Sequence, residues 1–258
     1  MFALRSTELS DLPTDDRSVL GRAFRIFGAF TCDRPSLTLS EVSRRTDIPL
    51  ATVHRLINQL VDNAALVRNP DGTYEFGVRM WEMGALAPRA HGLRQVALPF
   101  LEDLYEATHQ NVQLVVREGL QALCIERIAG HRSVSVLSRA GGRLPLHASS
   151  GGLVVLAHSG STVIDRVAVM ELEQFTTDTI VDKAQLLHTL ETIRRDGYVV
   201  CREHLSVGSV SVAAPIRAAN GTVAAAISVI LDKRTDPTPL IPALRAAANG
   251  ISRRLPRS

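Results

Sequence analysis

The chain has 258 residues, 45% of them apolar, so it is long enough for two domains with substantial cores. No apolar run approaches the roughly 20 residues of a membrane span, and residues 1–18 lack the apolar stretch of a secretory signal peptide. A net charge of +3 is compatible with binding nucleic acid, and three scattered cysteines fit a reduced, cytoplasmic protein.

Residues 1–15 are predicted to form a loose, disordered polar arm. The next segment, 17–30, predicts a helix that serves as the main packing element of a small domain. One face of this helix carries five apolar side chains: Leu20, Ala23, Phe24, Phe27 and Phe30. Arg17, at the start of the helix, is placed to reach a DNA backbone phosphate.

Segment 37–47 predicts a short helix with well-defined ends. Thr38 and Glu41 have the spacing of a capping box, in which each side chain bonds the other residue's backbone N–H. Arg44 and Arg45 fall near the helix end, where cations suit the helix dipole and can also meet phosphate. Asp47 occupies the following turn, because aspartate tolerates the left-handed conformation better than most residues.

A second helix is predicted to start at Pro49, whose missing N–H costs nothing in the first turn. Its buried stripe has the i, i+3, i+4 spacing: Val53, Leu56, Ile57, Leu60 and Val61. Arg55 points away from this stripe and is surrounded by polar or small residues: Ala51, Thr52, His54, Asn58 and Gln59. Such a surface suits the DNA major groove and indicates a helix-turn-helix, the alternative being an ordinary helical hairpin in a core.

The segment 66–76 predicts a β-hairpin, because Asp71-Gly72 lies between two short alternating stretches. A hairpin after the second helix is the wing of a winged helix-turn-helix, and Arg68 is placed to grip the DNA backbone. A surface hairpin without a ligand is the alternative. Between Arg17 and Arg79 there are nine Arg against six Asp or Glu, which mildly favours DNA.

Residues 79–108 are predicted to form linker helices, interrupted around Gly84 and Pro88. The second of them, 93–108, carries its apolar residues on one side: Leu98, Leu101, Leu104 and Tyr105. This side packs either against a partner subunit or in an intrachain core, and both interpretations remain open.

From residue 109 onward the pattern changes to strands joined by tight turns, and it predicts an α+β domain with an antiparallel sheet. The expected strands are 111–117, 122–128, 133–139, 197–203, 209–219 and 222–231. Asn220-Gly221 is the strongest hairpin signal. Helices are expected at 149–159, 163–169, 183–196 (with Asp182 as N-cap and Gly197 after its end) and 240–255.

The order of these elements and several segments resemble the IclR family of bacterial transcriptional regulators. The segments are RAFRIFGAF, LTLSEVSRRTDIPLATVHRLINQL, NPDGTYEFGVRMWEMG, RLPLHASSGG and RRDGYVV…GSVSVAAPIRAANGTVAAAISV. The resemblance implies an N-terminal winged helix-turn-helix, a linker helix and a C-terminal small-molecule domain related to GAF folds. It also implies a homodimer formed through the N-terminal half and a dimer of dimers formed through the C-terminal domains.

The segment 143–155 carries the most informative chemistry of the C-terminal domain. Free N–H groups at a helix N-terminus attract anions, and a small carboxylate is favoured over a nucleotide because no G-x-G-x-x-G is present. The resemblance implies that the backbone of Ser150 and Gly151 holds a small acid. It completes the predicted effector site with six further residues: Leu144, Cys201, Ser209, Ser211, Ser228 and Ile230.

Several positions depart from what relatives often carry. Cys201 stands where a carboxylate is frequent, Ser211 where a cysteine is frequent, and Ile230 where a serine also occurs. Leu50, at the start of the second helix, replaces a frequent polar residue. Without the carboxylate one end of the pocket is less polar. We therefore expect a larger or more apolar organic acid, a class that includes aromatic acids, rather than a two-carbon one.

Cys201, Glu203 and His204 raise the alternative of a metal site. On an extended strand His204 would point away from the other two, and no C-x-x-C or H-x-x-x-H completes a site. His147 near Ser149 suggests a hydrolase, but there is no G-x-S-x-G elbow, so we expect a structural hydrogen bond.

The sequence predicts a ligand-responsive, cytoplasmic transcriptional regulator, with no catalytic site, metal or cofactor and no membrane partner. Its domains are expected at 16–78 (DNA binding), 79–108 (linker) and 109–258 (effector binding). The expected partners are double-stranded operator DNA and a small organic acid. The expected DNA contacts are Arg17, Arg44, Arg45, Thr52, His54, Arg55 and Arg68. The alternative is an enzyme or metal sensor that keeps a winged-helix dimerisation module.

Overall fold

The computed structural model describes residues 18–31, 33–86, 88–130 and 138–256. The expected arm at 1–15, Arg17, and most of the expected strand at 133–139 lie outside the described residues. The chain divides into two compact units, Met1–His91 and Gly92–Ser258, and each is described by itself. Within the described ranges, no helix combines the length and the apolar character needed to cross a bilayer.

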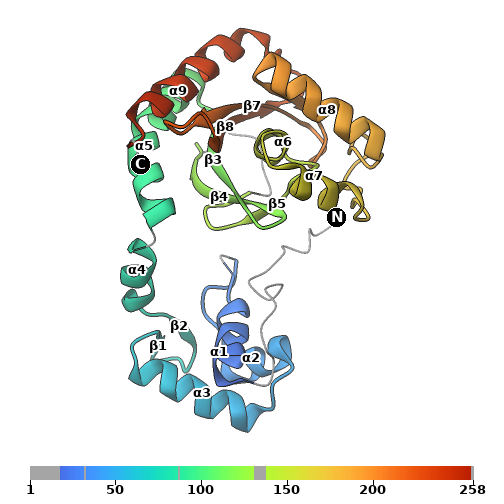
Figure 1. The fold of residues 1–258 in the computed structure, drawn as a ribbon. Helices are drawn as coiled ribbons and strands as arrows, with labels where there is room; N and C mark the ends of the chain where they lie inside the picture. Colours follow the sequence, from blue (N-terminus) through green and yellow to red (C-terminus); the bar gives the residue numbers. More distant parts are fainter. Residues whose placement is uncertain (1–17, 32, 87, 131–137, 257–258) are drawn as a thin grey trace. The chain divides into compact units, whose positions relative to one another are not determined.

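In the described part of the N-terminal unit, three helices precede a two-stranded hairpin and a further helix (Figure 1). They are α1 (Val19–Gly28), α2 (Leu39–Thr46), α3 (Leu50–Asp62), β1 (Leu66–Arg68), β2 (Tyr74–Phe76) and α4 (Val78–Ala85). One buried cluster joins them, and its largest fully buried side chains are Ile26, Leu37, Ile57 and Leu66. This order confirms the predicted winged helix-turn-helix.

The signals at both ends of α2 act as the sequence predicts, and the one at the start of α3 is displaced by one residue. The Glu41 carboxylate accepts the Thr38 N–H at 2.8 Å, and the Glu41 N–H bonds the Thr38 hydroxyl at 3.3 Å. Asp47 adopts the left-handed conformation, with φ of 53°. Pro49 lies one residue earlier than expected, because it is the N-cap of α3 rather than its first residue.

The predicted buried face of α1 is wrong in part. Leu20 and Phe24 are 72% and 49% exposed, whereas Ile26 and Phe27 are buried. The apolar residues of α1 cover an arc wider than one contact face, and only the edge that contains Ile26 and Phe27 meets the core. Helical periodicity finds such an arc but not the part of it that a neighbour covers.

The C-terminal unit is built on an antiparallel sheet of six described strands in the order β5-β4-β3-β8-β7-β6. The strands are β3 (Asn111–Glu118), β4 (Gln121–Ile128), β5 (Arg143–Pro145), β6 (Val199–Arg202), β7 (Ser209–Arg217) and β8 (Val223–Asp232). Gly119 and Gly221, both with positive φ, turn the β3–β4 and β7–β8 hairpins. The predicted α+β class with an antiparallel sheet is therefore confirmed.

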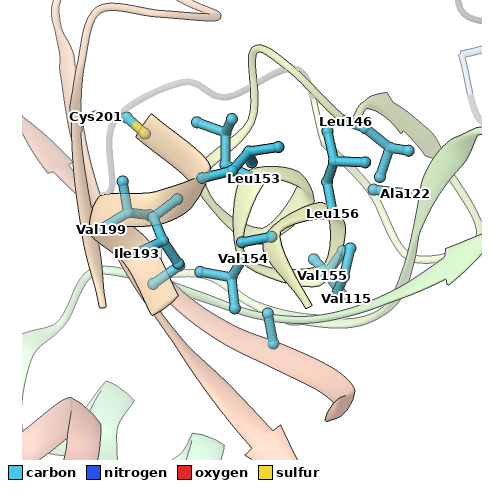
Figure 2. Packing of buried hydrophobic residues seen from close by; sticks show 14 of the residues in the cluster. Val115, Ala122, Leu146, Leu153, Val154, Val155, Leu156, Ile193, Val199 and Cys201 are labelled. Carbon is cyan, nitrogen blue, oxygen red and sulfur yellow. The ribbon is translucent and has the colours of Figure 1, made fainter. Parts of the chain in front are cut away.

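Helices cover both faces of this sheet. On one face lie α6 (Ser150–Ala157), α7 (Ser161–Ala168) and α8 (Lys183–Asp196), and on the other lie α5 (Pro88–Thr108) and α9 (Ile241–Arg254), which follows the short 3-10 helix η2 (Thr238–Leu240). Alternate residues of one strand serve the two faces: Val115 packs with α6, and Leu114 packs with α5 and α9. Figure 2 shows Leu153, Val154 and Val155 of α6 among the buried residues of the cluster that contains Val115.

The structure distinguishes the two interpretations of the linker for its second helix, α5. The break falls between Ala85 and Pro88, close to where the sequence places it. In α5, Ala97, Leu101 and Leu104 are buried in the intrachain core under the sheet. The core interpretation therefore holds for this part of the linker.

Candidate functional site

A cavity lies in the C-terminal unit at the N-terminal end of α6. The space in it that is open to the centre of a water-sized sphere is about 40 Å³. The eight residues of the predicted effector site all line this cavity: Leu144, Ser150, Gly151, Cys201, Ser209, Ser211, Ser228 and Ile230. Other described lining residues, which were not part of the predicted effector site, are Gln113, Val115, Ser138, Ala148, Ser149, His204, Leu205 and Ser206.

The N-terminal end of α6 offers two backbone donors to the cavity. Ser149 is the N-cap, and its hydroxyl donates to the Pro145 carbonyl at 2.7 Å and accepts the Gly152 N–H at 3.2 Å. The N–H groups of Ser150 and Gly151 lie in the first turn of α6, where a helix provides no acceptor of its own. No described residue accepts a hydrogen bond from either of them. Two donors at the positive end of a buried helix dipole thus belong to residues that line the cavity.

The paired glycines allow this helix to sit against its surroundings. A Cβ on Gly151 would lie 3.0 Å from a methyl group of Val115, and one on Gly152 would lie 2.8 Å from the Pro145 carbonyl oxygen. Both contacts are tighter than ordinary packing. The structure therefore gives both glycines a packing reason.

The sheet forms a polar floor where its α6-facing side extends past the helix end. Ser228 of β8 is the register partner of Gln113 on β3, and Ser211 of β7 is the partner of both Ile230 and Cys201. Elsewhere on this face the strands contribute apolar residues such as Val115. A patch of hydroxyl and amide groups thus interrupts an otherwise apolar surface.

His204 also lines the cavity, and this corrects the expected alternation of the Cys201–His204 segment. β6 ends at Arg202, and Glu203 takes a left-handed conformation with φ of 55°. Because of this turn, Cys201 and His204 both reach the cavity wall. The Glu203 carboxylate instead accepts the Gly208 N–H at 2.6 Å. Burial lowers the pKa of His204, and its Nδ1 is buried with no described partner.

The 171–180 segment supports this wall of the cavity from outside. The Thr176 hydroxyl donates to the Glu203 carbonyl at 2.6 Å, and the Thr179 hydroxyl donates to the His204 carbonyl at 2.7 Å. The His147 ring Nε2 lies 2.9 Å from the Glu173 carbonyl, which is the structural hydrogen bond expected for this histidine. Among the described residues, no three His, Cys, Asp or Glu side chains gather as a metal site would require.

The lining is electrically neutral in its side chains. None of the described lining residues is Lys, Arg, Asp or Glu. Burial raises the pKa of the Cys201 thiol to about 12, so this side chain is a neutral group in the wall. The backbone donors of α6 are therefore the positive feature of the described lining.

The N-terminal unit presents the outward face of α3 to solvent. His54 and Arg55 are exposed, Thr52 is partly exposed, and Asn58 Nδ2 lies 3.4 Å from the His54 ring. The buried stripe of the same helix consists of Val53, Leu56 and Ile57, with Leu60 and Val61 partly buried as predicted. Arg44 and Arg45 at the end of α2 and Arg68 on β1 are exposed as well.

The missed lining residues left one usable signal in the sequence. Gln113 is a buried amide between the apolar residues Val112 and Leu114, and such a group needs a polar partner. Ser138 carried no comparable signal, because its place in the wall depends on how distant segments fold together. His204 was considered only as a metal ligand, and the turn at Glu203 that brings it to the wall had no signal in the sequence.

Two family models match the chain and leave few residues between them. The model of the IclR helix-turn-helix domain matches residues 19–70, and the model of the bacterial transcriptional regulator IclR C-terminal domain matches residues 86–253. Among curated proteins, the HTH-type transcriptional regulator KipR of Bacillus subtilis is 32% identical over 76% of this chain and 79% of its own length. XynR of Escherichia coli is 30% identical over 83% of this chain and 86% of its own length.

Solved structures give the same result. An IclR homologue from Microbacterium hydrocarbonoxydans, in complex with 4-hydroxybenzoate, superposes with a TM-score of 0.89 at 36% identity, covering 93% of this chain and all of its own. A transcriptional regulator from Rhodococcus sp. RHA1 superposes with a TM-score of 0.80 at 28% identity, over 92% of this chain and 97% of its own. The chain therefore belongs to the IclR family, and it is a transcriptional regulator with a helix-turn-helix DNA-binding domain and a C-terminal effector domain.

Proposed function

We propose that this regulator binds operator DNA through α3 and the β1–β2 wing, and that it senses a small organic acid in the cavity beside α6. The observation that carries the effector part is the pair of N–H groups of Ser150 and Gly151, which lie in a cavity wall and have no acceptor among the described residues. A carboxylate suits such a site, because backbone donors at a helix N-terminus bind anions without a cationic side chain.

The body of the effector is proposed to be apolar and aromatic. Leu144, Leu205 and Ile230 contribute apolar walls, and the neutral Cys201 thiol adds to them. A similar regulator, 36% identical, was solved with 4-hydroxybenzoate. In binding pockets apolar walls supply most of the contact with a small molecule, while polar groups such as the serines of this lining fix its orientation.

The size of the cavity suggests how binding is transmitted. Only about 40 Å³ of the cavity is open to the centre of a water-sized sphere, so its walls lie close together. We infer that an aromatic acid binds best to a wider state of the pocket. A ligand that binds only this state shifts the protein toward it, and this shift alters how the DNA-binding domains meet the operator.

The proposed DNA contacts are Arg44, Arg45, Thr52, His54, Arg55 and Arg68 of the described residues, with Arg17 outside them. The exposed polar face of α3 would read base edges in the major groove, and the arginines of α2 and β1 would bind phosphate. A homodimer, assembled further into a dimer of dimers, would present two such helices to operator half-sites.

A proline substitution at the first residue of α6 tests the effector site. Ser150→Pro removes the N–H of this position, yet a helix accepts proline there, and Ser149 already has the extended ψ of 140° that a following proline requires. We expect Ser150→Pro to weaken 4-hydroxybenzoate binding about tenfold by calorimetry, as loss of a charged hydrogen bond would. Ser150→Ala keeps the N–H and is the matched control, with a much smaller effect.

Two outcomes contradict the proposal. The carboxylate does not bind at α6 if Ser150→Pro and Ser150→Ala bind 4-hydroxybenzoate equally well. The aromatic assignment fails if a thermal-shift screen finds the wild-type protein stabilised by the smallest oxo-acids alone.

A further inference from the structure

The floor of the cavity holds polar atoms that the described part of the chain does not bind. Ser228 is only 1% exposed and lines the cavity, and no hydrogen bond between described residues uses its hydroxyl. Gln113, its neighbour across β3 and β8, donates from Nε2 to the Ser138 hydroxyl, and its Oε1 has no described partner. Polar groups inside proteins are mostly hydrogen-bonded, and these two line one cavity with atoms that no described residue uses, so a ligand is the partner that fits them.

The geometry of β3 gives an approximate distance between these two groups and the end of α6. Gly151 packs on Val115, and Gln113 precedes Val115 by two residues on the same face of β3. Two residues advance about 7 Å along a strand. A ligand whose carboxylate meets the N–H groups of Ser150 and Gly151 therefore extends its far end toward Gln113 and Ser228.

We propose that the effector carries a hydroxyl group at the end remote from its carboxylate, and that Ser228 and Gln113 select it. The ligand hydroxyl donates to Gln113 Oε1 and accepts from the Ser228 hydroxyl, so that both of its hydrogen-bonding functions are used. A second carboxylate at this end is disfavoured, because the amide oxygen repels it and no described lining residue is cationic. This inference rests on the proposed effector site and adds the residues that discriminate between acids.

The test compares two acids that differ by this hydroxyl. Calorimetry on the full-length protein measures the affinities for benzoate and for 4-hydroxybenzoate, with 3-hydroxybenzoate as a second position for the group. We expect the wild type to prefer a hydroxybenzoate over benzoate. Ser228→Ala should weaken binding of the hydroxybenzoate roughly fivefold, the size of one ordinary hydrogen bond, and leave benzoate binding equal or tighter.

Two more variants separate recognition from packing. Ser228→Cys keeps most of the side-chain volume and should lose the preference as Ser228→Ala does. Ser159→Ala is the matched control, because the Ser159 hydroxyl bonds the Val155 carbonyl beyond the far end of α6 and does not line the cavity. This variant should keep the wild-type ratio of the two affinities.

The outcomes distinguish this inference from the proposal on which it rests. It is wrong, while the effector site stands, if the wild type binds benzoate as tightly as both hydroxybenzoates. It is equally wrong if Ser228→Ala weakens all the acids by the same factor. If the wild type binds none of these acids, the proposed aromatic effector fails and this inference fails with it.

Discussion

At the scale of single residues, Arg55 is the strongest candidate for sequence readout. It lies at the centre of the exposed face of α3, opposite the buried stripe of Val53, Leu56 and Ile57. An arginine that bonds a base edge contributes about 1–3 kcal/mol of specific binding, so Arg55→Ala should weaken operator binding by this amount. A gel-shift titration at fixed salt measures it.

Arg166→Ala provides the control for Arg55→Ala. Arg166 is an exposed arginine of α7, in the other unit, so its removal changes the net charge equally. The control should bind the operator as the wild type does. Equal losses in the two variants, or none in Arg55→Ala, would show that Arg55 does not read the operator.

The buried cysteines give a second prediction at this scale. Burial raises the pKa of both the Cys124 and the Cys201 thiols to about 12, so at pH 8 neither forms the reactive thiolate. We expect iodoacetamide to leave both unlabelled in the folded protein and to label both after denaturation, as read by mass spectrometry of the peptides. Rapid labelling of Cys201 in the native protein would mean that its wall of the cavity opens readily.

At the scale of elements, the 171–180 segment is predicted to hold the cavity wall in place. The Thr179 hydroxyl accepts the N–H groups of Phe175 and Thr176 and donates to the His204 carbonyl. Thr179→Val keeps the shape of the side chain and leaves these groups without their partner. We expect the free energy of unfolding in urea to fall by about 2–3 kcal/mol.

Thr189→Val is the matched control for this substitution. The Thr189 hydroxyl makes one exposed bond within α8, to the Gln185 carbonyl, so its loss should change stability by less than about 1 kcal/mol. A Thr179→Val protein as stable as this control would mean that the segment is not needed to hold the wall.

Elements whose ends carry local chemistry could be predicted from the sequence. The capping box of Thr38, the N-cap at Asp182 and the left-handed Gly197 each mark one helix end, and all three have the expected geometry. Asn220-Gly221 likewise turns the β7–β8 hairpin. These signals succeed because each depends on neighbours along the chain.

The parts that could not be predicted depend on distant contacts. The exposure of Leu20 and Phe24 reflects which side of α1 meets its neighbours. His204 reaches the cavity because the left-handed conformation of Glu203 reverses the expected alternation. The sequence has no glycine at this position that would predict such a turn. The lining residues named by family resemblance came together, whereas Gln113 and Ser138 became visible only once the strands were in register.

At the scale of the whole molecule, the exposed apolar residues of the N-terminal unit bear on the proposed dimer. Val78, Trp81 and Leu86 are exposed on or beside α4, and Leu20 and Phe24 are exposed on α1. Soluble proteins seldom leave several large apolar side chains of one small unit in water unless a partner covers them. This supports a contact between N-terminal units of two chains as the one that pairs the α3 helices.

A charge at Trp81 tests this contact. Trp81 is 73% exposed in the single chain, so Trp81→Glu should leave folding intact but place a carboxylate in the interface. We expect light scattering to show half the wild-type mass at equal concentration. Binding to a duplex with two half-sites should weaken strongly, while affinity for a single half-site and for 4-hydroxybenzoate stays the same.

Val169→Glu, at an equally exposed apolar residue after α7, is the control and should leave this dimer intact. A Trp81→Glu protein of unchanged mass and unchanged operator affinity would place the contact elsewhere on the chain.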